Sequence, residues 1–371
     1  MSAHEQRVRY ELADSGVPAL SLRDLCDLGL DLDQVMATPL HYPEVNGSAR
    51  IRERIAALYG TRPGRDFDVL VTVGAAEAAG LVVDALTEPG DRIAMMRPNY
   101  QQMAGIALNL SRDIVSFSLD PAAGWALRPD ELESSARGAK LVAVCNPNNP
   151  TGHVLSAEER EMVVTIARDN DAWLLADEVY VGTEHDGLET ASLFGNYEKT
   201  VVISSLSKAY GLSGLRLGWV AGPVAAVAAC WMRHEYATIA TSALSMLLGE
   251  FALVPDVRVA LFGRNRDYIV RGQVAIQEWV SDHPNLGITA PVATPVAFVN
   301  LGARLSSLEY ARQLVDKASV LVAPGQFFGG FDDHVRVTAA RPLEYLKPAL
   351  VLMSSVLHSM APDGRDGATH D

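Results

Sequence analysis

Residues 204–218 read SSLSKAYGLSGLRLG, a stretch that sets one lysine, Lys208, among small and hydroxyl-bearing residues. It follows the strand-like run VVIS at 201–204, so we expect Lys208 to lie in a loop just past the end of a strand. A lysine that reacts with a carbonyl group must be reachable and partly neutral, whereas a surface lysine stays charged. The stretch therefore predicts either a reactive lysine or an ordinary solvated loop lysine.

Outward from this stretch, strand-like and helix-like segments alternate. Short apolar runs at 69–73, 92–96, 141–145, 173–176, 201–204 and 217–221 predict strands, and 48–59, 74–86 and 158–168 have helical spacing. Such alternation is typical of an α/β fold with a mostly parallel sheet between helices. Ligand sites in these sheets lie at the carboxyl ends of the strands.

The pattern changes near residue 256. A long helical stretch at 257–280 leads to shorter strands at 296–301, 320–322 and 334–337, which predicts a smaller α+β domain. We therefore divide the chain into an N-terminal segment (1–40) near the site and the smaller domain, a large domain (41–255), and a small domain (256–360). The tail, 361–371, is polar and glycine-containing and is expected to be disordered.

Composition excludes several classes of partner. The 371 residues carry a net charge of −14, which argues against nucleic acid, because a nucleic-acid binder needs a basic face. No apolar run reaches the ~18 residues of a membrane helix, and no secretory signal is visible, so we expect a cytoplasmic protein. Cys26, Cys145 and Cys230 are far apart and form no metal-binding pattern, so no metal is expected.

Polar residues follow two more of the expected strands. The turn NPNNPTG at 146–152 holds Asn149, whose amide can donate a hydrogen bond to a phenolate oxygen. ADEVY at 176–180 places Asp177 at a strand end, where a carboxylate can keep a pyridine nitrogen protonated, and Tyr180 can donate to the same oxygen as Asn149. The ordinary alternatives are a structural Asn/Pro turn and a helix-capping aspartate.

The order of these motifs carries a resemblance. Gly74-Ala75-Ala76, Tyr100, NPNNPTG, DEVY, SxxK and RLG resemble the landmarks of the class I/II aminotransferases, enzymes of fold type I that use pyridoxal 5'-phosphate (PLP). The resemblance covers roughly residues 40–340. It implies a large PLP-binding domain, a smaller domain and an amino-acid substrate.

The resemblance also implies roles for single residues around the cofactor ring. Lys208 would hold PLP as a Schiff base and shuttle a proton. Asp177 would bind the pyridine nitrogen, and Asn149 and Tyr180 the phenolic oxygen. Tyr100 would stack on the ring.

Other residues are assigned by the resemblance to the phosphate and to the substrate. The expected phosphate contacts are Gly74, Ala75, Ala76, Ser205, Ser207 and Arg216. Tyr42, in HYPEVNG, matches a tyrosine lent to the phosphate of a neighbouring subunit, which implies a homodimer. Arg336, in HVRVTAA, matches the arginine that grips the substrate α-carboxylate, with Asn149 nearby.

Two departures from the family pattern stand out. The phosphate turn carries Ala75 and Ala76 where side-chain donors are usual, so Arg216, Ser205, Ser207 and Tyr42 would contribute more. The N-terminal segment is short and lacks the family's usual signature before the first helix of the large domain. Its stretch ADSGVPALSLRDLCDL, residues 13–28, is similar to the branch that includes capreomycidine synthase and the lincosamide-pathway enzymes that process cysteine S-conjugates. That branch belongs to antibiotic biosynthesis, and several of its members do not transaminate.

The sequence thus predicts a PLP-dependent enzyme that acts on an α-amino acid through external aldimine and quinonoid intermediates. The first reading is an aminotransferase. The alternative is a lyase of the same fold, which would perform β-elimination or decarboxylation-coupled deamination of a cysteine S-conjugate or modified amino acid. The cofactor supplies the hard chemistry in both cases, and the protein chooses which bond breaks.

Overall fold

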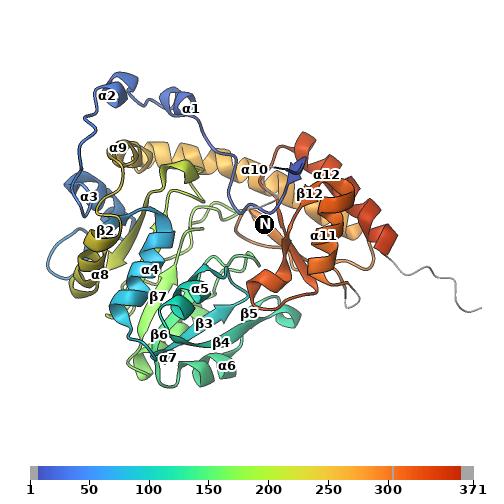
Figure 1. The fold of residues 1–371 in the computed structure, drawn as a ribbon, viewed down its shortest axis with the longest axis horizontal. Coiled ribbons are helices and arrows are strands. Elements are labelled where there is room, and N and C mark those ends of the chain that lie inside the picture. Colours follow the sequence, from blue (N-terminus) through green and yellow to red (C-terminus); the bar gives the residue numbers. More distant parts are fainter. Residues whose placement is uncertain (1–6, 303–304, 361–371) are drawn as a thin grey trace, which may run out of the picture.

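The larger part of the molecule is built on an eight-stranded sheet (Figure 1). The computed structural model describes residues 7–302 and 305–360. The strand order is β2-β9-β8-β7-β6-β3-β4-β5. The strands are β2 (Asp68–Thr72), β3 (Arg92–Arg97), β4 (Asp113–Asp120), β5 (Ala126–Leu127), β6 (Ala139–Cys145), β7 (Trp173–Asp177), β8 (Thr200–Ser205) and β9 (Gly218–Gly222). Strands β8, β7, β6, β3 and β4 run parallel, whereas β2, β9 and β5 pair antiparallel. The predicted α/β class is confirmed.

Helices cover both faces of this sheet, because side chains along each strand point alternately to the two sides. In β2, Leu70 is buried on one face, and Val69 and Val71 are buried on the other. The first face packs against α4 (Gly74–Leu86), α5 (Gln102–Asn109) and α8 (Val224–Ala237). The second packs against α3 (Ala49–Leu58), α6 (Pro129–Ala136), α7 (Ala157–Asp169) and α9 (Ala243–Ala252).

The smaller part holds a four-stranded antiparallel sheet with the order β10-β11-β14-β13. Its strands are β10 (Gly287–Ile288), β11 (Val296–Asn300), β13 (Ala323–Pro324) and β14 (His334–Thr338), and its helices are α11 (Ser307–Ala318) and α12 (Leu343–Met360). No helix within the described residues, 7–302 and 305–360, is long and apolar enough to cross a membrane.

One long helix, α10 (Pro255–Ser281), is anchored in both parts. Near its middle, Asn265 Nδ2 donates to the Ala209 carbonyl at 2.8 Å, in the loop that follows β8. Two turns later Gln273 Nε2 donates to the Val296 carbonyl at 2.9 Å, on β11. Between them, a Cβ added at Gly272 would lie 1.8 Å from the Ala339 carbonyl oxygen, so only glycine permits this approach. Helix α10 contributes side chains to the cores of both parts, so it does not mark a clean division between two domains. The domain boundaries at 40, 255 and 360 stay predictions.

The N-terminal segment passes from one part to the other (Figure 1). Strand β1 (Tyr10–Glu11) pairs in parallel with β12 (Val320–Leu321) beside the smaller sheet. Helices α1 (Leu22–Asp27) and α2 (Leu32–Met36) lie near α9, and Leu25 and Val35 share a core with Ile51 of α3. The residues between β1 and α1 therefore bridge the two parts. The predicted disordered tail, 361–371, lies outside the described residues.

Candidate active site

The predicted polar residues gather where β6, β7 and β8 end. These strands are neighbours in the sheet and run parallel, so the residues that follow them share one edge. Asn149 follows β6, Asp177 closes β7 and Lys208 follows β8. Arg336 of β14 joins them from the smaller part, because its Nη1 donates to Asn149 Oδ1 at 3.1 Å. The site thus lies between the two sheets.

Lys208 is held at the centre of this group. Its Nζ donates a hydrogen bond to Ser15 Oγ at 2.8 Å. Burial lowers the pKa of Lys208, and the charges of Arg336 and Arg216 act in the same direction, against those of Asp14 and Asp177. A lowered pKa increases the share of neutral amine, the form that attacks a carbonyl.

Asp177 lies beside Lys208 with one backbone donor. Burial raises the pKa of Asp177 to about 6, although the Val179 N–H and the charge of Lys208 lower it. That N–H reaches Asp177 Oδ1 at 3.2 Å, and no ion pair to this carboxylate occurs in the described part of the chain. A cationic group seated here would favour the charged carboxylate, and a protonated pyridine nitrogen has the required charge.

The turn that opens α4 forms a cradle for an anion. Gly74 has φ +78°, and a Cβ there would lie 2.6 Å from Arg216 Nη2, so the turn packs against the guanidinium. The first N–H groups of a helix have no intrahelical acceptors and attract anions. Ser207 Oγ lies 3.4 Å from Arg216 Nη1, on the same side. The backbone of Gly74, Ala75 and Ala76 with Arg216 and Ser207 therefore suits a phosphate.

Ser205, also predicted to approach the phosphate, has a local partner. It is buried, and its Oγ accepts the Ser207 N–H at 3.2 Å. This bond shapes the loop that leads to Lys208. A direct contact between Ser205 and a phosphate stays a prediction.

Arg336 is a buried guanidinium whose donors are only partly used. Besides Asn149, it donates to the Ala13 carbonyl, and the Phe328 ring centroid lies 4.9 Å from its Cζ. Its Nε has no partner among the described residues. Burial lowers the pKa of Arg336, so an incoming carboxylate would offset the burial of its charge.

Three tyrosines complete the set of predicted residues. Tyr180 is buried beside Arg336, and burial raises the pKa of its hydroxyl. Tyr100 is 55% exposed, in the loop after β3, where the neighbouring Asn99 N–H donates to the Phe328 carbonyl at 3.2 Å. Tyr42 is 78% exposed and makes no hydrogen bond to these residues within the described part of its own chain.

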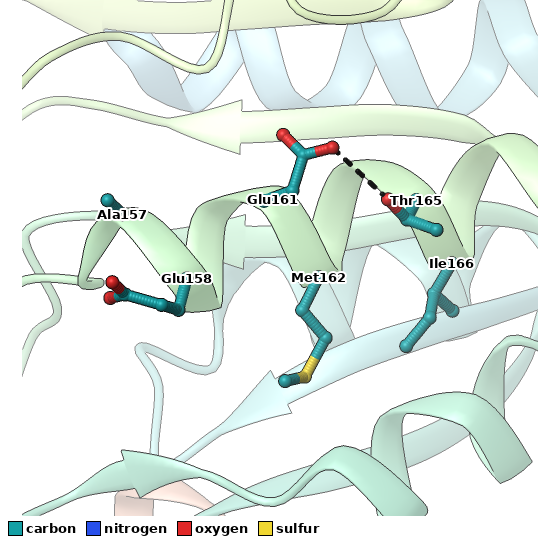
Figure 2. Close-up of a pocket in the computed structure, with 6 residues that line it drawn as sticks. All are labelled: Ala157, Glu158, Glu161, Met162, Thr165 and Ile166. Atoms are coloured by element: carbon teal, nitrogen blue, oxygen red, sulfur yellow. Dashed lines mark hydrogen bonds between the residues drawn. The ribbon is translucent and has the colours of Figure 1, made fainter.

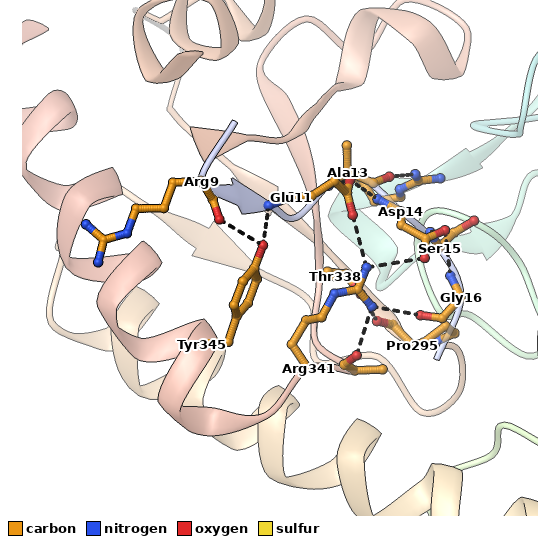
Figure 3. Close-up of polar contacts among 12 residues, drawn as sticks. Arg9, Glu11, Ala13, Asp14, Ser15, Gly16, Pro295, Thr338, Arg341 and Tyr345 are labelled. Carbon is orange, nitrogen blue, oxygen red and sulfur yellow. Dashed lines mark hydrogen bonds and ion pairs between the residues drawn. The ribbon is translucent and has the colours of Figure 1, made fainter. Parts of the chain in front are cut away.

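The structure adds residues 11–16, here called the strap, which the motifs did not indicate. Besides Ala13 and Ser15, the strap is tied by Leu12, whose carbonyl accepts the Thr338 N–H at 2.9 Å. Figure 3 shows Arg341, from the loop after β14, reaching the strap; it donates to Glu11 Oε2 at 3.0 Å and to Asp14 Oδ2 at 3.2 Å. The one hint in the sequence was the unusual stretch 13–28.

We expect Arg341→Gln to loosen the strap. It removes two partly buried ion pairs, together about 1 kcal/mol, so amide exchange at residues 12–16 should speed up about fivefold. Hydrogen exchange read by mass spectrometry tests this, with Arg312→Gln as control, since Arg312 pairs with Glu309 on the exposed face of α11. Unchanged exchange in the strap would show that Arg341 does not fasten it.

A second hollow lies away from these residues, on α7. Figure 2 shows that its lining residues, Ala157, Glu158, Glu161, Met162, Thr165 and Ile166, all come from this one helix. Its polar atoms are partly occupied with each other, as Thr165 Oγ1 donates to Glu161 Oε1 at 3.4 Å. Polar groups from other elements do not converge there, so the site at the strand ends is the candidate active site.

Comparison with known proteins identifies the family. Residues 34–351 match the family described as aminotransferase class I and II. The chain belongs to this family. An arginine–pyruvate transaminase from Pseudomonas aeruginosa is 28% identical over 347 residues, 89% of this chain and 86% of that protein. A capreomycidine synthase from Streptomyces vinaceus is 29% identical over 329 residues, 86% of this chain and 82% of that protein.

A solved structure agrees with the assignment. A PLP-dependent aminotransferase from Streptococcus suis superposes with a TM-score of 0.89 at 28% identity, covering 99% of this chain and 97% of that one. This aminotransferase-family protein is thus an enzyme of fold type I, and its cofactor is PLP. The residues fit that cofactor: the glycine turn packs on Arg216, and Asp177 forms no ion pair in the described part of the chain.

Proposed function

We propose that this enzyme is an aminotransferase that moves the amino group of an α-amino acid to a keto acid. The observation that carries the proposal is a buried arginine, Arg336, with an unpartnered Nε in the same site as Lys208. Arg336 suits a carboxylate, and Lys208 suits reactions between an amine and a carbonyl group. A substrate that meets both residues carries a carboxylate and an amino group, as an α-amino acid does. Bound PLP supplies the electron sink for such a reaction.

Each residue of the chain then has a proposed task. Arg336 and Asn149 fix the substrate carboxylate, which sets the orientation of the bonds at the α-carbon. Lys208 Nζ, with its lowered pKa, removes and returns the α-proton. Asp177 holds the pyridine nitrogen, Tyr180 and Asn149 the phenolic oxygen, and Tyr100 the ring face. The proposed phosphate ligands remain Gly74, Ala75, Ala76, Ser205, Ser207, Arg216 and, from a neighbouring copy, Tyr42.

We also propose that the enzyme works as a homodimer. Exposed apolar side chains surround Tyr42 in sequence, with Met36 78% and Leu40 80% exposed, and Tyr236 at the end of α8 is 94% exposed. Exposed apolar groups of this size favour a protein partner. A second copy would place Tyr42 near the phosphate of its neighbour.

The setting of the reaction is proposed on separate grounds. The cysteines of the described chain, Cys26, Cys145 and Cys230, are free thiols, which supports a reducing, cytoplasmic location. The similarity to a capreomycidine synthase supports a role in antibiotic biosynthesis.

The same similarity keeps the lyase alternative as the second candidate. A hydroxyl, Ser15 Oγ, also lies at hydrogen-bond distance from Lys208 Nζ, so a second proton-exchanging group stands at the reacting amine. Single-turnover assays with amino acids and cysteine S-conjugates separate the two reactions. Pyridoxamine phosphate together with the matching keto acid supports the aminotransferase. Regenerated PLP with ammonia, thiol or carbon dioxide contradicts it and supports the lyase.

We expect Arg336→Ala to raise KM for α-amino acids about 100-fold, because it removes charge-assisted hydrogen bonds to the carboxylate, about 3 kcal/mol in total. Amines that lack a carboxylate should be affected much less, and steady-state kinetics on matched pairs of the two tests this. Arg336→Lys serves as the control, since it keeps the charge but not the two-pronged geometry, and should recover part of the loss. An equal effect on amines and amino acids would show that Arg336 does not bind the carboxylate.

A further inference from the structure

His234 is a fully buried histidine that the proposed reaction does not use. It lies in the last turn of α8, and none of its surface is exposed. Its Nδ1 is 2.9 Å from Glu77 Oε1 on α4, and its Nε2 is 3.1 Å from the Val45 carbonyl oxygen. One ring therefore joins a helix to a distant loop.

Both ring nitrogens of His234 face hydrogen-bond acceptors. A carbonyl oxygen only accepts hydrogen bonds, so Nε2 must carry a proton. Burial raises the pKa of Glu77, but hydrogen bonds from His234, Thr238 and the Val73 N–H lower it further, so Glu77 is ionised and also accepts. The ring therefore lies between two acceptors, the Val45 carbonyl and the Glu77 carboxylate. The N-terminus of α4 favours the Glu77 anion.

The two partners of the ring hold the two segments assigned to the phosphate. Glu77 Oε2 accepts the Val73 N–H at 2.6 Å, directly before Gly74, and so fixes the start of the phosphate turn. Val45 lies three residues after Tyr42, and the next carbonyl, of Asn46, accepts the Val71 N–H at 3.1 Å. The Tyr42 segment and the phosphate turn thus share one buried anchor.

The end of α8 beside this anchor is exposed and strained. Ile239 has φ +69°, a left-handed conformation that is rare for a β-branched residue, and it is 44% exposed. Its N–H donates to the His234 carbonyl at 3.1 Å. Thr238 Oγ1 donates to Glu77 Oε1 in the same turn. Tyr236, proposed above as part of the subunit contact, therefore lies on the same turn as the anchor.

We propose that His234 is a positioning residue that couples binding of the cofactor phosphate at the Gly74 turn to pairing of two copies of the chain through the Tyr42 segment. This inference rests on the proposed homodimer. Coupling of this kind is reciprocal: if pairing tightens phosphate binding, phosphate binding tightens pairing by the same factor.

The test uses the full chain freed of PLP and measures two affinities. PLP and unphosphorylated pyridoxal are each titrated into the protein, and the dimer dissociation constant is measured by analytical ultracentrifugation with and without PLP. In the wild type, PLP should tighten pairing about tenfold. In His234→Gln, PLP affinity should fall about tenfold and PLP should no longer tighten pairing, while pyridoxal affinity stays the same.

Two further variants guard against loss of folding. His234→Gln leaves Glu77 without its ring partner, so the double variant His234→Gln/Glu77→Gln also removes the buried carboxylate and should show the same loss of coupling. His283→Gln is the matched control, because His283 Nδ1 bonds only locally, to the Trp279 carbonyl at 2.7 Å at the end of α10, and should behave as the wild type.

Several outcomes would overturn the inference. These are wild-type PLP affinity with intact coupling in both His234 variants, an equal loss of affinity for pyridoxal and PLP, or a wild-type chain that stays monomeric with PLP. The proposed transamination is judged separately by keto acid formation, so its failure is distinguishable from a failure of the coupling.

Discussion

Lys208→Ala is expected to reduce turnover by about 10⁴-fold or more, because the variant loses both the amine that bonds to the cofactor and the group that moves the α-proton. PLP should still bind, since Arg216, the glycine turn and Asp177 are intact, but only noncovalently. Borohydride reduction of the loaded wild type should fix the cofactor to the peptide that carries Lys208, and mass spectrometry reads this directly. The same treatment of the variant should leave no labelled peptide.

Lys140→Ala is the matched control for this experiment. Lys140 is an exposed lysine on β6, and its replacement should leave both labelling and turnover unchanged. Substantial turnover by Lys208→Ala, or label on another lysine, would remove Lys208 from the mechanism.

Asp177→Asn should have opposite effects on the PLP-free and the PLP-loaded protein. In the PLP-free chain the Asp177 carboxylate is buried without an ion-pair partner, and burial raises its pKa from 3.8 to about 6. The whole shift corresponds to roughly 3 kcal/mol, and we expect about 2 kcal/mol because part of the carboxylate faces the open site. The PLP-free variant should therefore be more stable than the wild type at pH 7 by about 2 kcal/mol, as measured by urea unfolding.

The sign of the pH dependence follows from the raised pKa. Between pH 4 and pH 6 the folded wild type holds the Asp177 proton more tightly than the unfolded chain, so its stability falls as the pH rises through this range. The variant lacks this titration. The stability difference between the two PLP-free proteins should be near zero at pH 4 and complete above about pH 6.

With PLP bound, the same variant should be impaired. Asparagine cannot keep the pyridine nitrogen protonated, so we expect turnover to fall about 10²–10³-fold, the scale found when one preorganised electrostatic contact is removed. Glu178→Gln is the matched control: burial also raises the pKa of Glu178, to about 7, but its Oε1 bonds to Ser192 and Leu193 outside the site. Near wild-type turnover in Asp177→Asn would show that Asp177 does not bind the ring nitrogen.

The sequence was informative about the large sheet because each motif follows a strand. Asn149, Asp177 and Lys208 lie within a few residues of strand ends, and the parallel order of β6, β7 and β8 brings those ends together. Strand β4 was missed although DIVSFSLD alternates apolar and polar residues. The phosphate turn and Arg336 could be predicted because they belong to recognisable motifs, and their roles stay predictions.

The strap and the His234 anchor could not be predicted in this way. Ser15 meets Lys208 across 193 residues and Glu11 meets Arg341 across 330, and no motif marks Ser15, Glu11 or Arg341. The anchor at His234 depends on two partners, Glu77 and Val45, that tertiary packing alone brings to the ring. Local patterns carry no record of such contacts.

The anchoring of α10 has a consequence for which substrates fit. Asn265 holds the loop of the reactive lysine, and Gly272 packs on the strand end that carries Arg336, so about 10 Å of rigid helix separates the two attachment points. The helix therefore fixes the distance between Lys208, where we propose that an amine reacts, and Arg336, where we propose that a carboxylate binds. An α-amino acid, whose amino group and carboxylate share one carbon, matches a single fixed distance between Lys208 and Arg336. Amino acids that carry the two groups on carbons further apart would require that distance to increase.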